Sequence, residues 1–158
     1  IEAASELLSN HIMDETGRLL GQEGEKNFVT LWKNDNKEVI LTQKDIRELQ
    51  LAKGAIYTGI ILLLKEAELS PSQLNHIDLA GAFGSNIDFN KAIHIGLLPH
   101  IGLDKISYIG NGALDGASKV LLGEISKSEA ENISKKIKHL ELALCEDFQE
   151  EFLKAMNF

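Results

Sequence analysis

The chain has 158 residues, of which 44% are hydrophobic and 25% are charged, a composition typical of one globular domain with a core. Its net charge is −8, with 24 acidic against 16 basic residues, which argues against a surface that binds nucleic acid or an anionic membrane. The single cysteine, Cys145, excludes an internal disulfide, and it excludes a thiolate-bound iron–sulfur cluster or zinc site within this chain.

Membrane and metal signals are missing from the sequence as well. No apolar run approaches the roughly 20 residues of a membrane-spanning helix, and no stretch resembles a signal peptide. We therefore expect a cytoplasmic location. The five histidines have no spacing that pairs them on one helical face, so no metal site is expected.

The first residues already show helical spacing, although neither a cap nor an initiator methionine precedes them. We therefore expect residues 1–158 to be a single domain cut from a longer protein. A glycine-punctuated turn, GRLLGQEGEK, is predicted over residues 17–26. NFVTLW and EVILT then flank the polar KNDNK and predict a β-hairpin.

A long helix is predicted to follow the hairpin, because TQKD at Thr42 has the pattern of a capping box. The helix should run to about Ala67, and its apolar stripe widens after Tyr57, so the second half is expected to be buried. Ser70 and Pro71 have the cap and first-turn positions of a further short helix.

The rest of the chain alternates strands and helices. HIDLA, KISYI and HLELAL are predicted as strands, and SKSE is a second capping box. Helices are predicted over 88–95, 117–122, 130–138 and 146–158. This alternation predicts an α/β fold in which helices flank a mixed sheet.

The glycine turn AGAFG after HIDLA is the main candidate site. A strand, a glycine turn and a helix together let backbone N–H groups meet an anion. The simpler interpretation is a tight packing corner, with Phe83 as a core anchor. GNGALDG, Gly110 to Gly116, is a loose relative of the dinucleotide fingerprint, but the acids Glu146 and Asp147 come too late in the chain for that fold.

The long helix supplies a second candidate. Gln50 and Lys53 are three residues apart on one face, where the helix passes from polar to apolar. An amide and an ammonium there could bind a base, a ribose or a phosphate, whereas the alternative is a solvated face.

Four segments together resemble the C-terminal domain of the reductive activators of corrinoid proteins, and they follow the order of that family. These activators are iron–sulfur proteins that use ATP to restore the cobalt(I) state. The resemblance covers nearly the whole chain, and its segments are LTQKDIRELQLAKGAIYTGI, IDLAGAFGSNIDFNKAIHIGLLP, YIGNGALDGASKVLL and LELALCEDFQEEFLKAMNF.

The resemblance implies the second lobe of an actin-like fold, as in sugar kinases, acetate kinase and chaperone ATPases. It implies that the strand–glycine turn contacts a nucleotide, that the long helix covers the base, and that GNGALDGA serves packing. The residues implied in nucleotide binding are Gln50, Lys53, Gly81, Ala82, Phe83, Gly84 and Asn86, with Asn86 capping the turn.

The resemblance also implies cofactors and partners. ATP or ADP with Mg would be shared with another lobe, because the superfamily's phosphate-binding hairpins and their acids are not found in this sequence. The iron–sulfur cluster would belong to an upstream region. Expected partners are the upstream domains and a corrinoid protein of a methyltransferase system, a homodimer is left open, and no catalytic residue is expected here. The alternatives are a partner-docking module without a ligand and a dinucleotide-binding domain.

Overall fold

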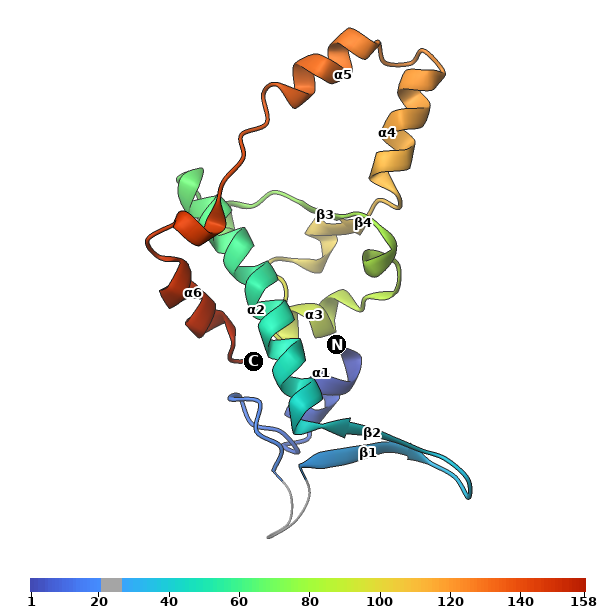
Figure 1. Ribbon diagram of the computed structural model, residues 1–158, viewed down its shortest axis with the longest axis vertical. Helices are drawn as coiled ribbons and strands as arrows, with labels where there is room; N and C mark the ends of the chain where they lie inside the picture. Colours follow the sequence, from blue (N-terminus) through green and yellow to red (C-terminus); the bar gives the residue numbers. More distant parts are fainter. Residues whose placement is uncertain (21–26) are drawn as a thin grey trace.

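The computed structural model of the protein describes residues 1–20 and 27–158 (Figure 1). Residues 21–26, the second part of the predicted GRLLGQEGEK turn, lie outside this description. The chain is α/β, as the alternation of strands and helices predicts. Its α-helices are α1 (Glu2–Ser9), α2 (Gln43–Glu66), α3 (Phe89–His94), α4 (Gly112–Leu121), α5 (Lys127–Ser134) and α6 (Phe148–Ala155). Its strands are β1 (Phe28–Lys33), β2 (Glu38–Thr42), β3 (Ile77–Leu79) and β4 (Ile106–Tyr108).

The four strands form two separate sheets, not the single mixed sheet that we expected. β1 and β2 form the predicted antiparallel hairpin, with an irregularity between Thr30 and Trp32. β3 and β4 pair in parallel. The predicted strand HLELAL is wrong: its last part is a single 3₁₀ turn, Leu142–Leu144. The segment runs from the end of α5 to the end of α2, away from β3 and β4, so no strand of the described ranges lies beside it (Figure 1).

The helix starts follow their capping signals. Thr42 and Asp45 form the predicted capping box of α2, and Ser126 and Glu129 form that of α5. Helix α4 begins at Gly112, earlier than predicted, because the Asn111 side chain accepts a hydrogen bond from the Leu114 N–H. Asp88 caps α3.

Helix α2 is the central element, and α6 packs along it (Figure 1). Gly54 makes this approach close, since a Cβ there would lie 3.4 Å from the Ala155 carbonyl oxygen. The predicted burial of the second half of α2 is correct for Leu62 and Leu64 but wrong for Leu63, which is 55% exposed. The described chain covers only part of the circumference of α2, which leaves Leu63 open to solvent.

The core lies where α1, the start of α2, α3 and the loop after α3 meet. Its buried members include Leu7, Ile46, Ala92, Ile95 and Ile106. In contrast, α4 and α5 form an arm that extends away from this core (Figure 1), and no residue of either helix is buried in the described structure. The core therefore packs against β3 and β4, and the arm begins shortly after the end of β4.

Candidate functional site

The two glycine turns lie side by side at the carboxyl ends of β3 and β4. The parallel register pairs Leu79 with Tyr108. Beyond it, the Ile109 N–H donates to the Leu79 carbonyl at 2.9 Å, and the Gly81 N–H donates to the Gly110 carbonyl at 2.7 Å. The carboxyl ends of parallel strands are the usual position of ligand sites in α/β proteins.

Gly81 and Gly110 both face open space. Their φ angles are +86° and +74°, a region that other residues enter only with strain. A Cβ on either residue would have no described heavy atom within 4 Å, apart from its immediate chain neighbours. The two backbones therefore border a space into which a ligand could approach closely.

Gly84 is small for a different reason. It is buried, and a Cβ there would lie 3.0 Å from the Tyr108 ring and 3.2 Å from the Leu79 Cβ. Gly84 therefore allows the turn to pack closely against β3 and β4. The turn AGAFG thus combines a packing glycine with an open one.

The remaining turn residues form a short 3₁₀ helix, Ala82–Asn86. The Ser85 hydroxyl donates to the Ala82 carbonyl at 2.7 Å, and the Asn86 amide donates to the Ser85 hydroxyl at 3.0 Å. Phe83 is 66% exposed, so the interpretation of this ring as a core anchor is wrong. Its ring is free to stack on a planar ligand.

The start of α4 completes this side of the site. Asn111 and Gly112 follow Gly110 directly, and Leu114 is 64% exposed on the first turn of the helix. The resemblance implies that GNGALDGA serves packing, yet no residue of α4 is buried in the described structure. The repeated strand–glycine–helix pattern was the signal that could have placed both turns in one site.

Gln50 and Lys53 lie on one face of α2, as predicted, but they face the C-terminal segment. Gln50 is 2% exposed, and its Nε2 donates to the carbonyls of Thr16 and Met156 at 3.0 and 2.8 Å. Lys53 donates to the Asn157 carbonyl, and its ammonium lies 5.0 Å from the centre of the Phe158 ring. The alternative of a solvated face is therefore wrong for these two residues.

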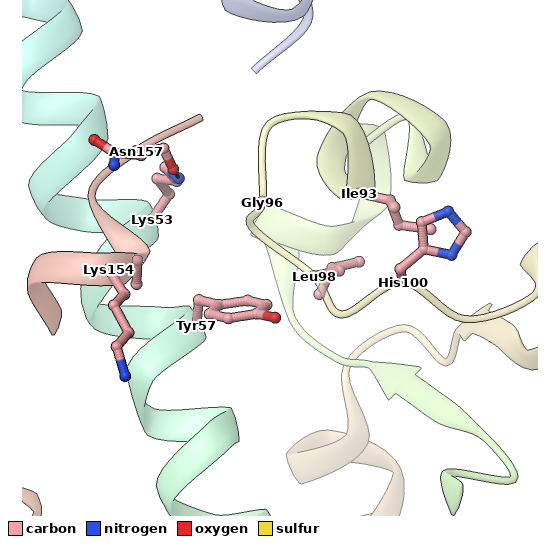
Figure 2. Close-up of a pocket in the computed structure, with 9 residues that line it drawn as sticks. Lys53, Tyr57, Ile93, Gly96, Leu98, His100, Lys154 and Asn157 are labelled. Carbon is pink, nitrogen blue, oxygen red and sulfur yellow. Dashed lines mark hydrogen bonds between the residues drawn. The ribbon is translucent and has the colours of Figure 1, made fainter. Parts of the chain in front are cut away.

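Burial changes the acidity of Lys53. The side chain is 1% exposed, and this desolvation lowers the pKa of its ammonium from 10.5 to about 8. Lys53 also lines a cavity of about 240 Å³ between α2 and the loop that follows α3 (Figure 2).

Asp78 has partners of its own on the β3–β4 pair. Its carboxylate accepts a 2.6 Å hydrogen bond from the Ser107 hydroxyl and lies 2.9 Å from His76 Nε2. The Ser107 hydrogen bond is the main cause that holds the pKa of Asp78 below its usual value, and His76 adds to it. Over residues 1–20 and 27–158, no three potential ligand side chains gather in a way that could hold a metal ion.

Comparisons with known proteins identify the family of the chain. The family described as "C-terminal domain of RACo the ASKHA domain" matches residues 1–158. The chain belongs to this family. The RACo C-terminal domain is an actin-like (ASKHA) domain of corrinoid activators, so the resemblance found in the sequence is confirmed.

Individual relatives of this RACo-type domain are similar over most of the chain. The corrinoid activation enzyme RamQ of Eubacterium limosum is 43% identical over 83% of the chain, and a [Co(II) methylated amine-specific corrinoid protein] reductase of Methanosarcina barkeri is 29% identical over 75%. A solved structure of a reductive activator for corrinoid, iron–sulfur protein matches 99% of the chain, with a TM-score of 0.85 and 32% identity. The matched regions make up 22%, 22% and 27% of these three proteins.

None of the helices in the described ranges is long and apolar enough to cross a membrane. The single cysteine, Cys145, cannot by itself hold an iron–sulfur cluster, which takes four protein ligands.

Proposed function

We propose that this chain is the nucleotide-binding lobe of an ATP-dependent reductive activator, which returns a corrinoid protein of a methyltransferase system to the cobalt(I) state. The observation that carries the proposal is the hydrogen bond between Gly81 and Gly110. It joins two open glycine turns at the carboxyl ends of parallel strands in a domain of the RACo family.

The glycine turn contributes several kinds of contact in this proposal. Gly81 and Ala82 offer the close backbone approach, and Phe83 offers an exposed ring for a purine. Gly84 and Asn86 hold the turn in shape, through packing on Tyr108 and through the hydrogen bond to Ser85. Gln50 and Lys53, which the resemblance also implied, have partners in the C-terminal segment, so the proposal leaves them out of the nucleotide site.

Phosphate chemistry would require parts beyond this lobe. Transfer or hydrolysis of a γ-phosphate depends on Mg²⁺ and on groups that orient the attacking water. Asp88 serves as the cap of α3, and Asp78 is bonded to Ser107, so neither is placed as a magnesium ligand at the turn. We therefore propose that Mg-ATP is shared with a second lobe, and that the electron-transferring cluster belongs to another part of the activator.

Closure of two lobes over Mg-ATP would couple the nucleotide to the partner. A ligand that binds the closed form better shifts the population toward it, and closure can then change the affinity for the corrinoid protein. This coupling would favour an uphill electron transfer. The corrinoid protein of a methyltransferase system is the proposed partner because the names of the similar proteins refer to corrinoid activation and corrinoid reduction.

Amide NMR of the chain tests the nucleotide site. Addition of ADP should shift the signals of Gly81, Phe83 and Gly110, with weak affinity, and should produce no ATP hydrolysis above background. A larger response to NADH than to ADP would instead support the dinucleotide-binding alternative. Absence of any response at these residues would support the partner-docking alternative, and steady-state ATP hydrolysis abolished by a Gly81 substitution would show that the chain holds a complete active site.

A further inference from the structure

The arm of α4 and α5 carries an apolar stripe along each of its helices. On α4, Leu114, Ala117 and Leu121 recur at helical spacing, and on α5 Ala130 and Ile133 do the same. Yet no residue of either helix is buried in the described structure. An amphipathic helix of a globular domain normally packs its apolar face on a core, so these two faces lack the surface that they would pack against.

The exposed apolar residues continue along the whole arm (Figure 1). Leu121 is 86% exposed and Leu122 is 73% exposed, and Ile137, which follows α5, is 73% exposed as well. Single apolar residues on a surface are normal, but several large ones along one element mark an interaction surface. The arm spans residues 112–138, which is enough for one side of a standard interface of about 20–30 residues.

The β3–β4 pair, from which the arm continues, is incomplete in a similar way. Ile77, Leu79 and Ile106 pack in or against the core cluster, so one face of the pair is covered. Asp78 and Ser107 lie on the other face, because side chains alternate along a strand, and the Asp78 side chain is 51% exposed. Parallel strands in α/β proteins have both faces covered. The described residues therefore leave a layer unfilled here too.

The length of the relatives indicates where the covering surface comes from. The solved activator contains a region similar to nearly the whole of this chain, arm included, and that region makes up 27% of it. A segment of the same polypeptide has an effective concentration of about millimolar at such a surface, so it would cover the stripes permanently. A separate partner would expose them each time it dissociated.

From the open stripes, the uncovered face of β3 and β4 and the length of the relatives, we propose that a further segment of the same polypeptide, outside residues 1–158, packs its own apolar face on the arm. The arm is then an internal interface of the activator. This inference rests on the proposed function because it takes the chain as one lobe of a longer activator. It does not require the glycine turns to bind a nucleotide.

Thiol labelling tests whether the arm is covered. Leu121→Cys is introduced, together with Cys145→Ser, into the 158-residue chain and into the complete activator polypeptide, and labelling is read at position 121 by mass spectrometry of its peptide. Position 121 should react at least about tenfold more slowly in the complete polypeptide than in the chain. Lys119→Cys is the matched control, because Lys119 lies on the opposite side of α4 and should react at similar rates in both proteins.

Equal rates at position 121 in the two proteins would overturn the proposal. Protection that increases with protein concentration would also overturn it, because a second copy would then cover the arm. So would protection that appears only when a corrinoid protein is added. If Leu121→Cys fails to fold, Ile137→Cys gives the same comparison at the other end of the arm. ADP binding is measured on the same proteins. A protected arm without an ADP response would contradict the nucleotide site alone, and an ADP response with an open arm would contradict this inference alone.

Discussion

The Gly81 amide donates a hydrogen bond to the Gly110 carbonyl at 2.7 Å, and both residues have positive φ angles. This bond extends the pairing of β3 and β4 into the turns, and it fixes the distance between the two open backbones. Substitutions at these glycines can therefore distinguish two effects. Backbone strain lowers the stability of the fold, whereas a blocked ligand contact weakens ADP binding.

Gly81→Ala should weaken ADP binding because its methyl group would occupy the open side of the turn. It should also cost about 1–3 kcal/mol of stability, because φ +86° with ψ 169° is a backbone conformation that essentially only glycine adopts. Gly123→Ala is the control: Gly123 has φ +76° and equally open surroundings, but it lies at the far end of α4. Calorimetry should show weaker ADP binding in the first variant only. Equal ADP binding by the two variants would instead support the interpretation of AGAFG as a packing corner.

Gly84→Ala should destabilise the fold by about 1–3 kcal/mol through overpacking. Its Cβ would press on the Tyr108 ring and on Leu79, which belong to the two paired strands. Urea unfolding measures the loss, and Gly84→Ala with Tyr108→Leu should recover part of it, because the ring would no longer obstruct the methyl group. A fully stable single variant would contradict the packing role.

Gly116→Ala should act in the opposite direction. Gly116 lies within α4, its φ is not positive, and no described atom would lie within 4 Å of a new Cβ. Alanine should therefore favour the helix by about 0.5–1 kcal/mol. Slower amide hydrogen exchange in α4 would show it, and unchanged or faster exchange would mean that this glycine has a role beyond the helix.

Lys53 should make stability depend on pH in the alkaline range. The unfolded chain keeps the Lys53 proton up to a pKa near 10.5, whereas the folded chain releases it near 8. Between these values the unfolded state binds more protons, so raising the pH favours the folded state. Urea unfolding should show the stability of the unchanged chain rising relative to Lys53→Met from about pH 8 to 10.5. Parallel profiles would contradict the shifted pKa, and Lys44→Met, which removes an exposed lysine from the same helix, should follow the unchanged chain.

The helix starts and the hairpin could be predicted from the sequence, because their signals are local. The capping boxes at Thr42 and Ser126, the cap at Asp88 and the hairpin of β1 and β2 depend on neighbours within a few residues, and all of them form. HLELAL failed because a short alternation of leucines fits a strand only when another strand is near, and its surroundings are the ends of α2 and α6.

The candidate site was readable in part for the same reason. AGAFG was identified from its local pattern, but its pairing with Gly110 depends on two strands meeting in parallel, which no short motif encodes. Gln50 and Lys53 were placed on one face correctly, yet their partners, Met156 and Asn157, lie at the other end of the chain. Polar residues that bind distant backbone carbonyls have no signature of their own in a sequence.

The arm of α4 and α5 divides the chain at a place where a cut would be tolerated. None of its residues is buried, while α6, which follows it, is fastened to α2 by packing and by the Lys65 contacts with Asp147 and Glu151. A protease should therefore nick the arm first, and the two pieces should stay associated and migrate together until they are denatured. The same property makes the loop between α4 and α5 a natural place to open new chain ends in a circular permutant, or to insert a reporter domain.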